Sequence, residues 1–285
     1  MRIDLHSHSN ASDGTDSPEQ LIGYAVAAGL DVVALTDHDT FAGIDAAAAA
    51  AERSGITLIP GAELSAAYGE TSVHILAYLV DRTHPELALA LERARTERFT
   101  RGERMVARSV ELGAPITWAQ VQALAGAAPV GRPHIARALV AAGVVESEAD
   151  AFSPDWIGHR GRAYVHRRAT AAVDAVRLIR AAGGVAVFAH PGAYDRGRVV
   201  PDEVIVELAA AGLAGLEVDH PDHDPPTRDR LRALAAELGL LVTGSSDDHG
   251  AATGHRLGCE TTAPDTYQAL VGLASGATPL GARSR

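Results

Sequence analysis

Residues 1–14 read MRIDLHSHSNASDG, and this stretch sets a pattern that recurs along the chain. An alternating strand over residues 2–6 runs directly into His6-Ser7-His8, and Asp13 follows five residues later. Side chains two positions apart on a strand share one face of the sheet, so His6 and His8 point the same way. Paired imidazoles at the end of a strand are typical of a metal site. The stretch therefore predicts a strand that presents metal ligands at its carboxyl end.

The composition favours an α/β enzyme. Hydrophobic residues make up 47% of the 285 residues but aromatic residues only 4%, so Ala, Val and Leu must fill the core. Small aliphatic side chains suit the close packing of helices on a sheet better than the core of a β-sandwich. The length fits one large domain or a domain that carries an insertion.

The charge balance excludes one large class of partner. The net charge is -11, from 25 Lys and Arg against 36 Asp and Glu. Long nucleic acid needs a broad basic track, which this balance does not provide. Clustered carboxylates are compatible with bound divalent ions, which offset their charge.

No pattern in the sequence predicts export or membrane insertion. Cys259 is the only cysteine, so an internal disulfide and a CxxC zinc site are both excluded. Asp4, His6 and His8 occupy positions where a signal peptide would carry apolar residues, and no apolar run is long enough to span a membrane. We therefore expect a cytoplasmic protein with no membrane partner.

Strands and helices alternate over most of the chain. Strands are expected at 2–6, 31–35, 56–59, 72–80, 185–188, 215–218 and 240–244, with a short pairing segment at 163–165. The helices that alternate with them are expected at 17–28, 41–54, 170–182, 201–211, 226–238 and 264–274. Parallel strands with functional groups at their carboxyl ends are the arrangement by which a (β/α) barrel builds an active site.

Residues 85–165 interrupt this alternation with helical patterns alone. The expected helices cover 85–112, 117–126, 132–142 and 147–152. Their charged faces are typical of solvated helices with i,i+4 pairs. We predict an inserted helical, substrate-binding subdomain over 98–164, and a barrel that carries the metal site, built from 1–97 and 165–285.

Nine His, Asp and Glu residues recur at the ends of the predicted strands. They are His6, His8, Asp13, His38, Glu63, His74, His190, Asp247 and His249. Such ligands without cysteine suit Zn, Mn or Fe, and a carboxylate can bridge two ions. Nine groups are too many for one tetrahedral site, so we expect two or three divalent metal ions that share a bridging carboxylate.

These residues lie in motifs that resemble one known family. The motifs are His6-Ser7-His8, TDHD at 36–39, Gly61-Ala62-Glu63, AHP at 189–191 and SDDHG at 246–250. In this order they resemble the polymerase and histidinol phosphatase (PHP) family. The resemblance covers nearly the whole chain, and it implies a distorted (β/α)7 barrel with a multinuclear metal centre.

The family pattern implies three metal positions. The first would use His6, His8, Glu63 and Asp247. The second would use Glu63, His74 and His190, with Glu63 as the bridge. The third would use Asp13, His38 and His249. Asp13 stands where many family members carry histidine, and Asp248 stands where most carry an aromatic residue.

The insertion resembles that of particular PHP members. Gly131-Arg132-Pro133-His134 begins a predicted helix, as in the stand-alone phosphoesterases that act on nucleotide phosphates. The resemblance implies that Arg132 and His134 face the substrate, that Arg160 or Arg162 binds a phosphate, and that His223 lies near the substrate. One arginine guanidinium can donate two parallel hydrogen bonds to phosphate oxygens, and the first turn of a helix offers backbone N–H groups that have no partner within the helix. A surface ion pair for Arg132 and an exposed loop position for His223 stay open as alternatives.

The expected activity is metal-dependent hydrolysis of phosphomonoesters of nucleotides, such as 3′,5′-nucleoside bisphosphates or AMP. A metal-bound water with a lowered pKa would attack the phosphorus. One of His190, His134 and His223 would protonate the leaving oxygen. The partner is therefore a small phosphorylated substrate, either a nucleotide or a short oligonucleotide.

Four other functions are weaker candidates. A 5′→3′ exonuclease on short RNA would use the same site. Histidinol phosphate phosphatase ranks lower because the GRPH segment at 131–134 indicates nucleotide handling. A C–N amidohydrolase of the kind that uses a carbamylated lysine is disfavoured, since the chain contains no lysine. A non-catalytic metal-binding module ranks last, because all nine ligand positions are intact.

Overall fold

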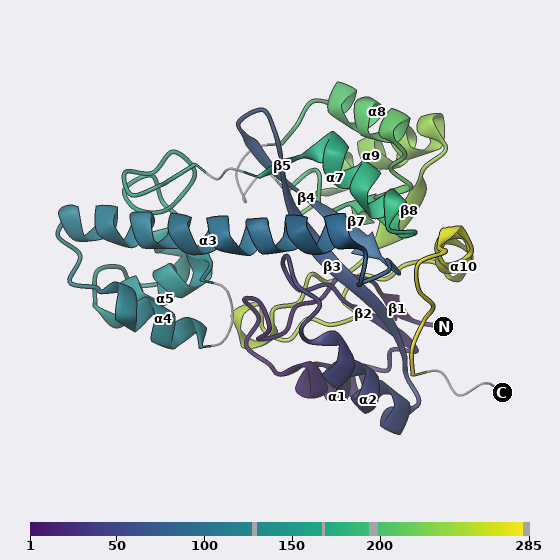
Figure 1. Ribbon diagram of the computed structural model, residues 1–285, viewed down its shortest axis with the longest axis horizontal. Helices are drawn as coiled ribbons and strands as arrows, with labels where there is room; N and C mark the ends of the chain where they lie inside the picture. The colour runs from purple at the N-terminus through teal and green to yellow at the C-terminus, as the bar shows by residue number, and fades with distance from the viewer. Residues whose placement is uncertain (127–129, 167–168, 194–198, 282–285) are drawn as a thin grey trace. The chain divides into compact units, whose positions relative to one another are not determined.

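Eight strands form one sheet in the computed structural model, which describes residues 1–126, 130–166, 169–193 and 199–281. The strands are β1 (Ile3–Asp4), β2 (Val32–Leu35), β3 (Thr57–Tyr68), β4 (Thr71–Tyr78), β5 (Thr170–Ala171), β6 (Val185–Phe188), β7 (Gly215–Asp219) and β8 (Leu241–Gly244). Seven of them follow the order β1-β2-β3-β4-β6-β7-β8, and β5 pairs with β3 (Figure 1). A backbone bridge between Ser7 and Asp248 joins the segments after β1 and β8, so the sheet is a nearly closed barrel.

The predicted distorted (β/α)7 barrel is confirmed, but the direction of one strand differs. The pairs β1–β2, β2–β3, β6–β7 and β7–β8 are parallel, whereas β4 runs antiparallel to both β3 and β6. The prediction of a parallel strand here is wrong because only Gly69 and Glu70 separate β3 from β4. A parallel connection needs a crossover of a dozen or more residues. Gly69 adopts φ 56°, which suits this tight reversal.

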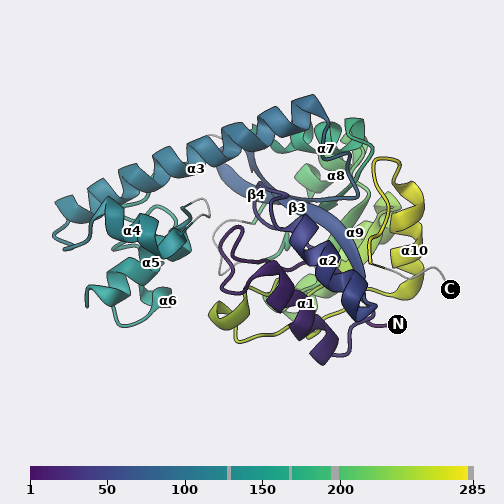
Figure 2. The same ribbon diagram turned by 60° about the horizontal axis from the view of Figure 1, so that its bottom comes forward.

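Alternate residues of β2 pack on opposite faces of the sheet. Val32 and Ala34 point into the barrel, while Val33 and Leu35 pack against two helices outside it. The two helices lie side by side in Figure 2 and are α1 (Pro18–Ala27) and α2 (Ile44–Ser54). Burial on both faces explains why this strand is a continuous apolar run.

The remaining helices of the barrel cover its other strands and its amino end. They are α7 (Ala172–Ala181), α8 (Asp202–Ala211), α9 (Pro225–Leu238) and α10 (Pro264–Leu273). The first three share an apolar core with β3, β4, β6 and β7. Tyr267 and Leu270 of α10 pack in the same core as Ile3, Val32 and Val185, which begin their strands. The carboxyl ends of the parallel strands therefore lie opposite α10.

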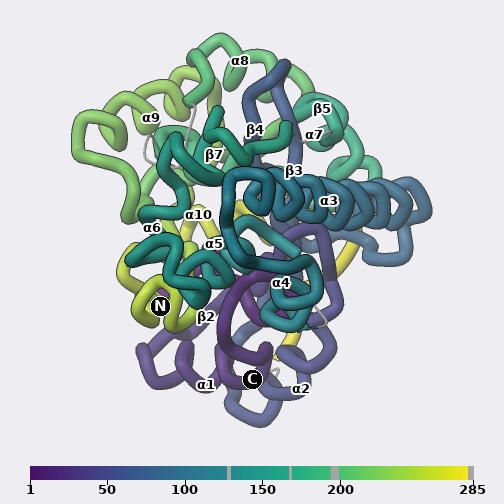
Figure 3. Tube along the Cα trace, turned by 90° about the vertical axis from the view of Figure 1, so that its left-hand side faces the viewer, coloured from purple at the N-terminus to yellow at the C-terminus, as the bar shows by residue number. Residues whose placement is uncertain are grey.

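The chain divides into two compact units, Met1–Leu91 with Thr170–Arg285, and Glu92–Ala169. The second unit holds most of α3 (Pro85–Glu111), together with α4 (Trp118–Ala125), α5 (Arg132–Ala141) and α6 (Glu148–Ala151). Its three short helices pack together, as Figure 3 shows, around a separate apolar core. One boundary between the units falls within α3, since a single continuous helix serves both. The predicted substrate-binding role of residues 98–164 stays a prediction.

The short strand predicted at 163–165 is wrong. Ala163, Tyr164 and Val165 are buried in the core of the second unit without strand pairing, and β5 lies further along the chain. The sequence of a short apolar run does not distinguish a paired strand from an irregular segment that fills a core. Among the described residues, no helix combines the length and the apolar character that a membrane span requires.

Candidate metal centre

The nine residues predicted as metal ligands form one connected cluster in the barrel unit. Seven of them lie in the segments after β1, β2, β6 and β8, which are His6, His8, Asp13, His38, His190, Asp247 and His249. Glu63 instead lies within β3 and His74 within β4. In the antiparallel register of these strands, the two residues are diagonal rather than directly opposite neighbours. His74 is the most exposed of the nine, with 24% of its side chain accessible. The cluster is therefore largely withdrawn from water.

Glu63 lies at the centre of the cluster. Five imidazole nitrogens surround its two carboxylate oxygens. Around Oε2 these are His38 Nδ1 at 3.0 Å, His8 Nε2 at 3.2 Å and His6 Nε2 at 3.3 Å, and around Oε1 they are His74 Nδ1 at 2.7 Å and His190 Nε2 at 3.1 Å. A carboxylate with different histidines around each oxygen is placed to bridge two metal ions.

The first metal position predicted from the sequence has its donor atoms close together. Asp247 Oδ1 lies 3.2 Å from His8 Nε2 and 3.3 Å from His6 Nε2, and the two imidazole nitrogens are 3.0 Å apart. Glu63 Oε2 lies beside the same two nitrogens. These four donors converge on one point, as the ligands of a single ion would.

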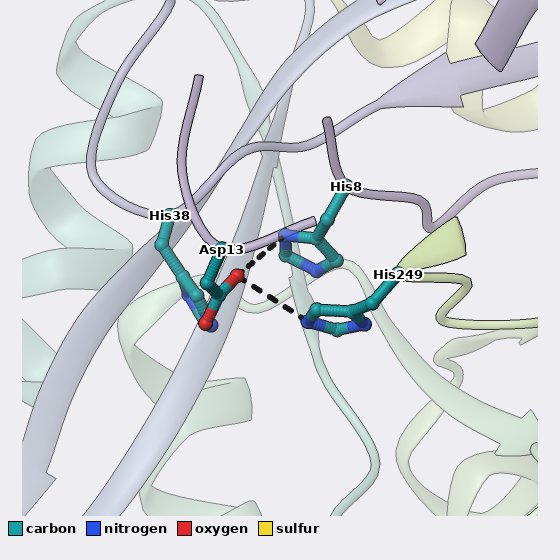
Figure 4. Close-up of side chains that lie close together, drawn as sticks. All are labelled: His8, Asp13, His38 and His249. Carbon is teal, nitrogen blue, oxygen red and sulfur yellow. Dashed lines mark ion pairs between the residues drawn. The ribbon is translucent and has the colours of Figure 1, made fainter. Parts of the chain in front are cut away.

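A second convergence surrounds Asp13, between His38, His8 and His249 in Figure 4. Asp13 Oδ1 lies 3.4 Å from His249 Nε2 and 3.9 Å from His8 Nδ1, and Oδ2 lies 3.6 Å from His38 Nε2. The sequence did not predict His8 in this group. A neutral imidazole has one lone pair to offer. His8 Nε2 makes the shorter contacts, at 3.2 Å to Glu63 Oε2 and to Asp247 Oδ1, and these lie in the first group, where His8 was predicted.

His38 stands between the groups predicted for the second and third positions. Its Nδ1 lies 3.0 Å from Glu63 Oε2, and one donor atom from each of His38, Glu63 and His74 gathers within 4.8 Å. The sequence assigned His38 to the third position and His190 to the second. The structure thus brings the predicted residues together, while the division of His38 and His190 among the ions stays a prediction.

The electrostatics of the cluster favour cations. Burial alone would lower the pKa of His6, but the carboxylates of Asp247, Glu217 and Glu63 raise it well above its usual value. Burial likewise would raise the pKa of Glu63, but His74, His38 and His6 hold it well below. The buried carboxylates of the cluster are therefore stabilised by nearby positive charge, which divalent ions would supply. Nitrogen and oxygen donors without sulfur fit Zn, Mn or Fe.

Two predicted ligands adopt an uncommon backbone conformation. His190 has φ 31° and Asp247 has φ 49°, in the region that residues with a Cβ rarely adopt. Such a conformation costs about 1–2 kcal/mol and persists only where the surroundings hold it. The His190 N–H donates to Glu217 Oε2 at 2.7 Å, which fixes one of these two positions.

Both ring nitrogens of His223 are engaged by backbone groups. Nδ1 donates to the Val218 carbonyl at 2.9 Å, so Nε2 is the acceptor for the Gly192 N–H at 3.0 Å. A Cβ at position 192 would lie 2.3 Å from Thr227 Cγ2, so only glycine allows this approach. The geometry favours a structural role for His223, and its predicted part in catalysis or substrate binding gains no support.

The other predicted substrate residues lie in the second unit. Arg132 is the first residue of α5, and its guanidinium carbon lies 5.3 Å from the centre of the Phe152 ring. His134 is buried, and its Nδ1 accepts the Gly131 N–H at 2.9 Å. A neutral His134 therefore carries its proton on Nε2. Arg160 and Arg162 both have exposed side chains, and only Arg160 of the two adopts a positive φ, of 58°.

Residues 4–184 match the PHP domain family. The chain belongs to the PHP family. It is 35% identical over 260 residues to a 3′,5′-nucleoside bisphosphate phosphatase of Chromobacterium violaceum, with 89% of each chain covered. It is 36% identical over 248 residues to a 5′-3′ exoribonuclease of Haemophilus influenzae, with 87% of this chain and 90% of the relative covered. The solved structure of a candidate metal-dependent phosphoesterase from Bifidobacterium adolescentis has a TM-score of 0.91 at 39% identity, with 96% of both chains covered.

Two carboxylates that flank His38 hold the loops of the PHP centre and were not predicted. Asp37 accepts hydrogen bonds from Ser9 N at 2.8 Å, Ser9 Oγ at 2.6 Å and Ser12 Oγ at 2.6 Å. Asp39 accepts from Ser65 N and Ser65 Oγ, both at 2.7 Å. The TDHD motif could have indicated this supporting role. Adjacent side chains in an extended segment point in different directions, so the two aspartates could not both face the same partner as His38.

Asp248, which lacked an explanation from sequence, orders the turn after β8 in this PHP chain. Its carboxylate accepts hydrogen bonds from Gly250 N at 3.0 Å, Thr253 Oγ1 at 2.8 Å and Arg256 N at 2.8 Å. The side chain is only 2% exposed, so water cannot replace these bonds. Asp248 thus shapes the segment that carries His249.

Replacing Asp248 with alanine is expected to lower the free energy of unfolding by about 2–3 kcal/mol, because buried donors lose their acceptor. Urea denaturation of the metal-free protein measures this change. Asp155→Ala is the control, since Asp155 is exposed, and it should change stability by less than about 0.5 kcal/mol. An Asp248→Ala protein as stable as the control would show that these bonds do not order the turn.

Proposed function

We propose that the chain hydrolyses phosphomonoesters of nucleotides, such as 3′,5′-nucleoside bisphosphates or 5′-AMP, at the cluster around Glu63. The enzyme class, a metal-dependent phosphoesterase, follows from the PHP family and from the named activities of its relatives. The observation that carries the proposal is the buried carboxylate of Glu63, which has five imidazoles around its two oxygens. That arrangement is suited to hold two ions against one phosphate group.

The residues of the centre divide into holding and bridging groups. His6, His8 and Asp247 would hold one ion, and Glu63 would bridge it to a second. When bound, two or three Mn, Zn or Fe ions neutralise the phosphate oxygens and lower the pKa of water. Most of the ligand side chains are buried, and the lower dielectric of such a setting strengthens the charge interactions within it.

The nucleotide specificity is proposed from the insertion and the relatives. The Chromobacterium violaceum and Haemophilus influenzae relatives are named for a nucleoside bisphosphate and for RNA, both of which carry nucleotide phosphates. Arg132 would give a phosphate two parallel, charge-assisted hydrogen bonds. Among the three histidines considered as proton donor, His190 Nε2 contacts Glu63 and His223 is engaged by the backbone. His190 and His134 therefore remain the candidates for protonation of the leaving oxygen.

The test is phosphate release from a defined panel. Protein loaded with Mn²⁺ should release inorganic phosphate from adenosine 3′,5′-bisphosphate and from 5′-AMP, and it should leave histidinol phosphate and N-acyl amides largely untouched. Addition of excess EDTA should reduce the rate to background. If the loaded protein cleaves no phosphate ester in the panel, the proposed function is wrong.

A second candidate is a 5′→3′ exonuclease on short RNA, favoured by the 36% identity to the Haemophilus influenzae exoribonuclease. It would use the same metal centre but attack a phosphodiester. A 5′-phosphorylated RNA dinucleotide separates the two functions. Release of nucleoside 5′-monophosphate indicates the exonuclease, whereas loss of the terminal phosphate alone indicates the phosphatase.

A further inference from the structure

Glu217 on β7 lies behind the metal centre and was not among the predicted site residues. Its side chain is fully buried. Oε1 lies 3.0 Å from His6 Nδ1 and also accepts a hydrogen bond from Ser245 Oγ, and Oε2 accepts the backbone N–H of His190 at 2.7 Å. One carboxylate thus contacts the segments that follow β1, β6 and β8.

The contact between Glu217 and His6 fixes which nitrogen of His6 carries the proton. Both oxygens of the Glu217 carboxylate already accept hydrogen bonds, Oε1 from the Ser245 hydroxyl and Oε2 from the His190 N–H. A carboxylate that accepts at both oxygens leaves Nδ1 of His6 as the donor in their contact, so Nδ1 is the protonated nitrogen. Nε2 then keeps its lone pair. Nε2 is also the atom that faces His8, Glu63 and Asp247.

The contact between Glu217 and His190 acts on the backbone. His190 has φ 31°, and its N–H is held by Glu217 while its ring Nε2 lies 3.1 Å from Glu63 Oε1. A strained residue keeps its conformation only where such contacts hold it. Glu217 therefore orients two predicted ligands that reach opposite oxygens of Glu63.

We propose that Glu217 is a positioning residue that presents His6 Nε2 and His190 to the metal ions without binding an ion itself. This inference rests on the proposed metal-dependent function. Outer carboxylates that hold a ligating imidazole raise metal affinity about 10–100-fold. β7 contributes none of the nine predicted ligands, and its function in the centre is to support those of its neighbours.

Glu217→Gln is a sharp test, because all three partners of the carboxylate are donors. An amide must turn its NH₂ group toward at least one of them, and it must lose that hydrogen bond. If the NH₂ group faces His6, the imidazole proton moves to Nε2 and blocks that atom. Tyr78→Phe is the matched control: Tyr78 is fully buried and its hydroxyl donates to the carbonyl of Leu5, which is not a predicted ligand, at 2.7 Å.

The measurement is the affinity of metal-stripped protein for Mn²⁺ by calorimetry, with the melting temperature in EDTA recorded for each variant. Glu217→Gln should raise the dissociation constant of the tightest ion about 10–100-fold, and Tyr78→Phe should leave it within error of wild type. Equal affinity in Glu217→Gln and wild type would overturn the inference alone. A wild-type protein that binds no Mn²⁺ would overturn the proposed function as well.

A readout on the wild-type protein does not depend on how the variant folds. Long-range ¹H–¹⁵N spectra of histidine-labelled protein, loaded with diamagnetic Zn²⁺, report which nitrogen of each imidazole carries a proton. His6 should be protonated on Nδ1 and bound through Nε2. Coordination of His6 through Nδ1 would contradict the proposed role of Glu217.

Discussion

Replacing Glu63 with glutamine is expected to lower phosphate release from adenosine 3′,5′-bisphosphate by about 1000-fold. Glu63 has imidazoles from five histidines around its two oxygens. Glutamine keeps the size but removes the charge and one acceptor oxygen, so it cannot bridge two ions. The loss of about 4 kcal/mol of transition-state stabilisation corresponds to this factor. The rate is measured by phosphate release at saturating Mn²⁺.

Two measurements make the Glu63→Gln result interpretable. Glu52→Gln changes an exposed glutamate on α2 and should retain the wild-type rate. Elemental analysis should show that Glu63→Gln protein retains less metal than wild type after the same loading and desalting. A Glu63→Gln enzyme with wild-type rate and metal content would show that the centre does not depend on a bridging carboxylate.

Replacing Arg132 with alanine is expected to lower kcat/KM for adenosine 3′,5′-bisphosphate by about 100-fold. The side chain would make two charge-assisted hydrogen bonds with one phosphate, and their loss without replacement accounts for this magnitude. The Phe152 ring, 5.3 Å from the guanidinium carbon, holds the group in place for that contact. Arg132→Lys should recover only part of the loss, since lysine cannot bond in the same paired geometry.

Arg137→Ala is the matched control for Arg132. Arg137 lies on the same helix, and its Nε lies 3.6 Å from Glu148 Oε1. A similar loss in both variants would point to damage of α5 rather than to a phosphate contact, and would contradict the assigned role of Arg132. The same assay on Arg160→Ala and Arg162→Ala tests the prediction that one of these two arginines binds phosphate.

The positions of the candidate ligands could be predicted because the chemistry restricts both residue type and place. Only His, Asp and Glu could hold such ions in a chain with one cysteine, and strand ends are legible from apolar runs followed by polar residues. His6, His38, His190 and Asp247 all follow strands of the barrel. The nine residues form a connected cluster even though the direction of β4 was predicted wrongly. The antiparallel register of β3 and β4 still places His74 beside Glu63.

The supporting residues could not be predicted because their partners are distant in sequence. Glu217 lies in the strand Gly215–Asp219, and its partner His6 is 211 residues away. The neighbouring sequence does not distinguish a buried glutamate that accepts three hydrogen bonds from a glutamate that points to solvent. His223 was placed near the substrate by the family resemblance alone, and the backbone groups that engage both of its ring nitrogens are likewise distant from any local sequence signal.

The most direct measurement is phosphate release by metal-stripped wild-type protein before and after Mn²⁺ is restored. The stripped protein should release no phosphate from adenosine 3′,5′-bisphosphate, and the rate should rise with bound Mn²⁺ until two or three ions per chain are present. Glu63→Gln protein in the same titration should stay near background. Full activity in stripped protein, or none after wild-type protein has bound Mn²⁺, would contradict a metal-dependent nucleotide phosphoesterase.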